Sequence, residues 1–77
     1  MSHLSTVITR VENKVKAYGD DRDGLKRDTL FLQAVCNLRE YQDAWTDQTK
    51  KEVERADELF YEYKNLLVGT PYQYPRS

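Results

Sequence analysis

The chain has no glycine or proline between Leu25 and Val68, a stretch of 44 residues. Within it, a repeat of 3.6 residues joins positions 31, 35, 38, 42, 45, 49, 53, 56, 60, 63 and 67, most of which hold apolar side chains. A stripe with this period places its residues on one face of an α-helix. The sequence therefore predicts an all-α fold in which this stretch is helical.

Two architectures fit the long stretch. One is a single helix of roughly 65 Å within an oligomer, and the other is a hairpin of two helices broken near residues 45–49. The stripe turns polar at Thr49, and Thr49 with Glu52 has the spacing of a capping box. Folding back also gives a chain of 77 residues a compact core. We therefore favour the hairpin, with helices at about 24–45 and 49–68.

A shorter helix precedes the hairpin. Apolar side chains from Leu4 to Tyr18 recur at steps of three and four, and Gly19 has the position of a residue that ends a helix. These signals predict a helix at about 4–18. Gly69 and Pro71 end the last helix in the same way.

The expected organisation is one small three-helix domain over residues 1–69, made of the short N-terminal helix and the long hairpin. Residues 70–77 are expected to form an extended tail rich in Tyr and Pro. Self-association, most simply as a homodimer, is a further expectation because so short a chain can complete its core across an interface. The expected core is Ile8, Val11, Val15, Phe31, Val35, Leu38, Trp45, Val53, Phe60, Tyr63 and Leu67.

Composition argues against several classes of function. The chain holds one Cys (Cys36) and one His (His3), too few for a disulfide or a structural zinc site. It shows no phosphate loop, nucleophile elbow or Cys-His arrangement. We therefore expect no enzyme, no cofactor and no bound metal, and read Cys36 as a buried apolar residue. A single Cys and the lack of a long apolar run lead us to expect a cytoplasmic protein that does not insert into a membrane.

The charges leave one local candidate for nucleic-acid binding. Overall the chain is balanced, with 12 basic and 13 acidic residues. A basic cluster nevertheless lies at the junction of the first two expected helices. Asp residues alternate with these cations in the sequence, and their negative charge opposes phosphate binding. The members of the cluster are Arg10, Lys14, Arg22, Lys26 and Arg27.

The aromatic residues suggest a protein partner instead. Tyr61 lies off the apolar stripe, and Tyr72, Tyr74 and Arg76 lie in the expected tail. Tyr and Arg are enriched where proteins bind one another. The leading hypothesis is a non-catalytic protein that inhibits or adapts a larger assembly by steric occlusion; the alternative is a nucleic-acid-binding regulator. In size and lack of catalytic residues the chain is similar to small helical inhibitors carried by phages, such as counter-defence or host-takeover factors, although no motif carries this likeness.

Overall fold

The structure, a computed structural model, describes the backbone of residues 3–44 and 49–72 and the side chains of 3–40 and 49–72. The all-α prediction is confirmed: every regular element in the described part is helical. These elements are α1 (His3–Tyr18), α2 (Arg22–Arg27), α3 (Thr29–Ala44), α4 (Lys50–Tyr63) and the 3₁₀ helix η1 (Lys64–Leu67).

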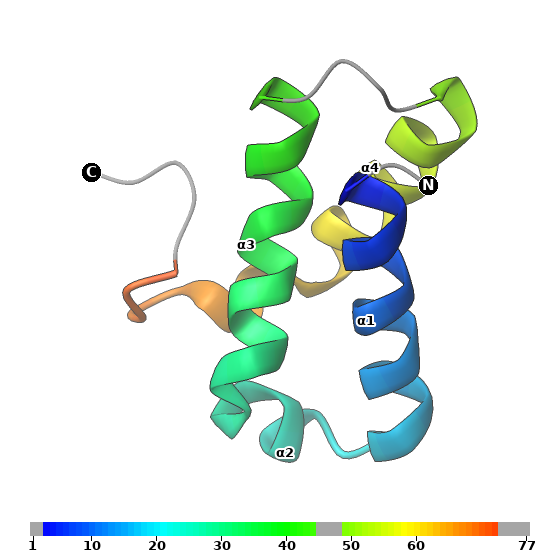
Figure 1. The fold of residues 1–77 in the computed structure, drawn as a ribbon. Coiled ribbons are helices and arrows are strands. Elements are labelled where there is room, and N and C mark those ends of the chain that lie inside the picture. The colour runs from blue at the N-terminus through cyan, green and yellow to red at the C-terminus, as the bar shows by residue number, and fades with distance from the viewer. Residues whose placement is uncertain (1–2, 45–48, 73–77) are drawn as a thin grey trace.

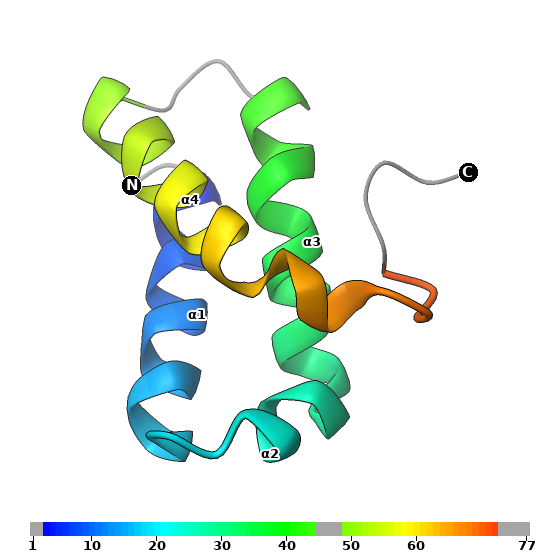
Figure 2. The same cartoon turned by 180° about the vertical axis from the view of Figure 1, so that it is seen from behind.

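The helices form two layers. α1 and α3 lie side by side and antiparallel, and short α2 joins them at one end (Figure 1). α4 crosses behind this pair and contacts both helices, and η1 continues it past α3 (Figure 2). None of the described helices lies on the opposite face of the α1/α3 pair, which is turned to the viewer in Figure 1.

The predicted helix at 24–45 is wrong as a single element, so the described residues form four α-helices and not three. Asp28 separates α2 from α3 with an extended backbone (φ −86°, ψ 100°). Its Oδ1 accepts a hydrogen bond from Phe31 N at 3.1 Å, which caps the first turn of α3. The periodicity did not show this break because the apolar stripe begins at position 31, after the break.

The long stretch is not one continuous helix, because α3 ends at Ala44 and α4 begins at Lys50, and the last helix is shorter than expected. Thr49 caps α4, and the reciprocal bonds between Thr49 and Glu52 complete the predicted capping box. α4 ends at Tyr63 and tightens into η1 instead of continuing to Val68. Such 3₁₀ turns are common at helix ends, where the last carbonyls have no α-helical partner.

Both glycines expected at helix ends have left-handed backbones, with φ 60° at Gly19 and 81° at Gly69. Glycine adopts this conformation without the steric cost that a Cβ imposes. Beyond Gly69, Thr70 Oγ1 donates a 2.6 Å hydrogen bond to Leu67 O and accepts one from Tyr72 N. The chain therefore turns back at residues 70–72, and the rest of the expected tail lies outside the described residues.

The core lies where the two layers meet. Most of its expected members are buried, Val15 and Val53 are half-buried against it, and Trp45 lies outside the described residues. The buried members of the expected set are Ile8, Val11, Phe31, Val35, Leu38, Phe60, Tyr63 and Leu67. Further buried residues, which the expected core did not include, are Leu4, Val7, Leu25, Leu32, Ala34, Ala56 and Leu59. The buried arc is wider than one stripe because each long helix packs against neighbours on two sides.

Candidate functional site

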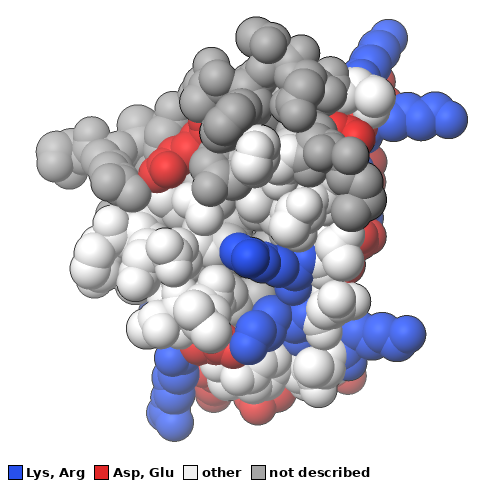
Figure 3. Space-filling view, viewed as in Figure 1, with Lys and Arg blue, Asp and Glu red and all other residues white. Residues whose placement is uncertain are grey.

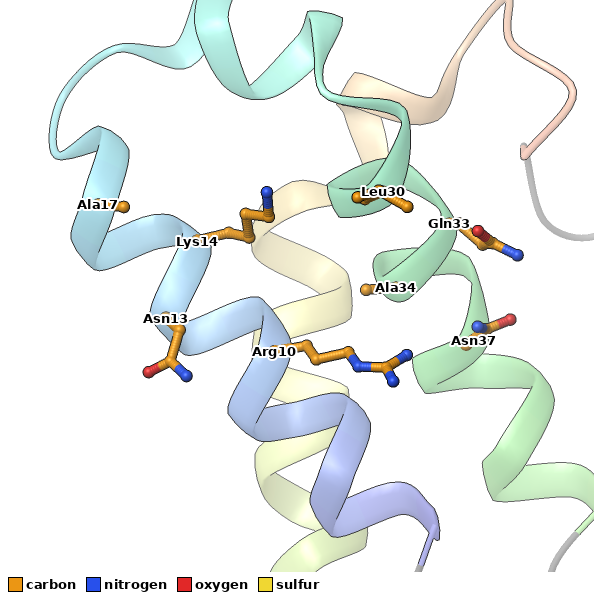
Figure 4. A pocket seen from close by; sticks show the side chains of 8 residues that line it. All are labelled: Arg10, Asn13, Lys14, Ala17, Leu30, Gln33, Ala34 and Asn37. Atoms are coloured by element: carbon orange, nitrogen blue, oxygen red, sulfur yellow. The ribbon is translucent and has the colours of Figure 1, made fainter.

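A groove of about 750 Å³ runs between α1 and α3 on the face that α4 does not cover. Each helix contributes one stripe with the spacing i, i+3, i+4, i+7, so each wall is a single helix face. The α1 wall is Arg10, Asn13, Lys14 and Ala17, and the α3 wall is Leu30, Gln33, Ala34 and Asn37 (Figure 4).

The two ends of the groove differ in chemistry. Ala17 and Leu30 line the end of the groove near α2 from opposite walls, and Leu30 is 66% exposed although it is aliphatic. Two turns away, Arg10 extends from α1 toward α3, opposite Asn37 (Figure 4). Figure 3 shows this face with Lys and Arg side chains across its middle, over the space between the two helices. The groove is therefore apolar at one end and cationic at the other.

Between these two ends, an ion pair of Lys14 connects the α1 wall to the residue that precedes α3. Lys14 Nζ lies 2.9 Å from Asp28 Oδ2, and Tyr18 Oη donates a second 2.9 Å hydrogen bond to the same oxygen. The hydrogen bond from Lys14, with those from Phe31 N and Tyr18, holds the pKa of Asp28 below its usual range. The bond to Asp28 in turn raises the pKa of Lys14 and of Tyr18. Lys14 thus has an acidic partner within the domain.

Arg10 differs from Lys14 in this respect. It is exposed, and it has no ion-pair or hydrogen-bond partner among the residues that the structure describes. Within the same described set, the amides of Asn13, Gln33 and Asn37 are also without side-chain partners. The groove therefore presents one guanidinium between its walls, with the three amides at its outer edges (Figure 4).

Comparison with models of protein families, with curated proteins and with solved structures finds no match for this chain.

The structure divides the basic cluster between two faces. Arg10 and Lys14 come together in the groove. Arg22 instead lies over the ring of Tyr63, 5.3 Å from its centroid, and donates a 3.4 Å hydrogen bond to Glu62 O. Lys26 and Arg27 are exposed on α2. The five cations therefore do not form one continuous surface.

The aromatic candidates are also separated. Tyr61 is 62% exposed on α4, with Lys64 Nζ 4.6 Å from its ring centroid. Tyr72 is half-buried and packs against the core, and Tyr74 and Arg76 lie outside the described residues. The exposed aromatic surface in the described part is thus centred on Tyr61.

Other chemistry has little structural basis in the described part. Cys36 is buried, as expected, and its Sγ donates a 3.2 Å hydrogen bond to Glu40 Oε1. The described side chains, those of residues 3–40 and 49–72, bring together no group of three or more His, Cys, Asp or Glu that could hold a metal. Their helices also include none with the length and apolar character needed to cross a bilayer.

Sequence reasoning found two of the eight groove residues, Arg10 and Lys14, but for a different reason. The signal that could have revealed the rest is the second helical stripe on each helix, beside the core stripe. This stripe holds short side chains such as Ala17, Ala34 and Asn37, which leave space above the helix. Whether this second stripe lines a groove depends on the pairing of α1 with α3, and periodicity alone does not predict that pairing.

Proposed function

We propose that this chain is a non-catalytic domain that binds another protein by seating a helix of that protein in the groove between α1 and α3. The observation that carries the proposal is the face of this helix pair that α4 leaves uncovered, with Leu30 exposed on the α3 wall beside small and amide side chains. Bound in this way, the domain would act as an inhibitor or adaptor by covering a surface of its partner.

A helix suits the groove on geometric grounds. Two antiparallel helices form a trough along their line of contact, and a third helix can bury its apolar face there. The α1 wall is part of a helix of 16 residues, so the trough is up to about 24 Å long. A partner helix of about four turns would fill it.

Protein binding is also favoured over catalysis. The titratable groups of the groove are Arg10 and Lys14, and Lys14 is held by Asp28. General acid–base catalysis needs a group whose pKa lies near the working pH. The Lys14 ammonium does not meet this need, because its hydrogen bond to Asp28 raises its pKa. Arginine, in contrast, is enriched in protein interfaces.

The test uses two matched variants of the full chain as baits in affinity capture from the cells that make it. Leu30→Asp places a carboxylate in the groove, at the start of α3 where negative charge is compatible with the helix dipole. Val68→Asp makes the same change at another exposed aliphatic residue, which is not part of the groove. Each capture is run with and without nuclease.

The expected result is a protein retained by the parent and by Val68→Asp but lost with Leu30→Asp, regardless of nuclease. If the partner protein still binds Leu30→Asp but no longer binds Tyr61→Ala or Tyr72→Ala, the binding surface lies at the aromatic residues and not in the groove. Retention that nuclease abolishes would favour the nucleic-acid alternative and overturn the proposal.

A further inference from the structure

We infer that the helix seated in this groove is acidic, with a carboxylate that binds Arg10 about two helical turns from an apolar side chain that covers Leu30. The inference rests on the proposed function and adds the chemistry and the spacing of the partner.

The charges on the groove walls select an anion. The eight wall residues include two cations and no Asp or Glu. Asp28 already accepts from Lys14 at 2.9 Å, so the cation left to a ligand is Arg10. A guanidinium can bind a carboxylate through two parallel hydrogen bonds, whereas a basic helix would be repelled at the same point.

The amides extend this preference. Asn37 lies opposite Arg10, and Asn13 and Gln33 lie one turn nearer to α2 on their respective helices (Figure 4). An amide both donates and accepts, so these side chains can bond to the polar flank of a partner helix. They fix its position without adding a charge that would oppose the carboxylate.

The spacing follows from the antiparallel packing of the walls. Seven residues separate Arg10 from Ala17 on α1, and seven separate Leu30 from Asn37 on α3. Seven residues of helix rise about 10 Å. A partner helix that lies along the groove therefore needs an apolar residue and an acidic residue seven positions apart. Between them, the buried Ala34 leaves room for one further apolar side chain.

A nucleic-acid ligand fits the same groove less well. Phosphate binding gains from several free cations along one surface. Here Lys14 is paired with Asp28, and Arg22 lies on Tyr63. The Leu30 end would bury no apolar surface against a sugar–phosphate backbone.

The experiment is a display selection on the full-length chain with a library of helical peptides of about 20 residues, randomised along one face. Three baits are compared with the parent. Arg10→Glu reverses the charge in the groove. Lys51→Glu makes the same change in net charge at an exposed residue of α4, outside the groove. Leu30→Asp disrupts the apolar end of the groove. Circular dichroism checks that each bait is helical, and Arg10→Gln replaces Arg10→Glu if the latter fails to fold.

We expect the parent and Lys51→Glu to enrich peptides with Asp or Glu seven positions from Leu, Ile, Met or Phe. Arg10→Glu should weaken these peptides by about tenfold and should enrich Lys or Arg at the acidic position. Arg10→Gln should weaken the peptides without this reversal.

Enriched peptides without the acidic position, but still dependent on Leu30, would overturn the acidic partner and leave the proposed function standing. The inference would be overturned if the enriched peptides bind equally well to the Arg10 and Leu30 variants, or if the selection enriches no peptide. The affinity capture with Leu30→Asp then decides separately whether a protein occupies the groove. Displacement of the enriched peptides by duplex DNA or RNA at matched ionic strength would also overturn it, in favour of a phosphate ligand.

Discussion

Lys14 Nζ lies 2.9 Å from Asp28 Oδ2, so an ion pair joins the wall of the groove on α1 to the residue that begins α3. The same carboxylate caps α3 through Phe31 N. One side chain therefore determines where α3 starts, holds α1 beside it, and takes up one of the two groove cations. The shape and the charge of the groove both depend on this contact.

The first prediction concerns the cap. Asp28→Ala should lower the free energy of unfolding by about 1–2 kcal/mol, the usual cost of an N-cap carboxylate, because Phe31 N loses its acceptor. Asp28→Asn keeps an oxygen at this position and should fall between the parent and Asp28→Ala. Urea unfolding measures all three proteins. Equal midpoints for the parent and Asp28→Ala would show that Asp28 does not stabilise α3.

The second prediction is a loss of stability in acid. The folded pKa of Asp28 lies below the ordinary value of 3.8, so its contribution is complete at pH values above 3.8. It is lost as the pH falls from there through the lower folded pKa, because protonation then removes the charge that binds Lys14. Urea midpoints of the parent and Asp28→Asn, measured from neutral pH downward, should differ most near neutrality and converge at the acid end. A constant difference across this range would contradict the assignment.

The third prediction concerns the contact between the two layers. Phe31 is 0% exposed, and its ring meets Tyr63 edge-to-face with 5.4 Å between centroids. Phe31→Ala should cost roughly 3–5 kcal/mol, enough to threaten the fold of a domain this small. Phe31→Leu keeps most of the volume and should cost clearly less. Thermal unfolding compares the two, and an Ala variant that melts within a few degrees of the parent would refute this role.

The fourth prediction concerns the hairpin. Thr49 Oγ1 accepts from Glu52 N at 3.2 Å, and Glu52 Oε2 accepts from Thr49 N at 3.3 Å. Thr49→Ala should cost about 1 kcal/mol, because α4 loses its cap, and Thr49→Ser should cost little. Chemical denaturation measures both variants. A Ser variant as unstable as the Ala variant would show that the hydroxyl is not the stabilising group.

Several features could be predicted from local sequence because local chemistry decides them. Thr49 and Glu52 are three residues apart and bond to each other's backbone, so their spacing was enough to place the start of α4. Gly19 and Gly69 end helices because they adopt a positive φ that other residues avoid. The stripe that includes Phe31, Val35 and Leu38 is buried because a helix of period 3.6 brings these side chains to one face.

Other features required the tertiary structure. Asp28 ends one helix and begins the next because Lys14 and Tyr18, on another helix, hold its carboxylate. The groove exists because α4 packs on one face of the α1/α3 pair and leaves the other uncovered. By itself, the sequence determined which residues form helices and which of their faces are apolar, since hydrogen bonds and side-chain spacing within a helix are local. Only packing decided which polar faces meet, because the groove places Arg10 and Lys14 of α1 beside residues of α3 that are distant in the chain.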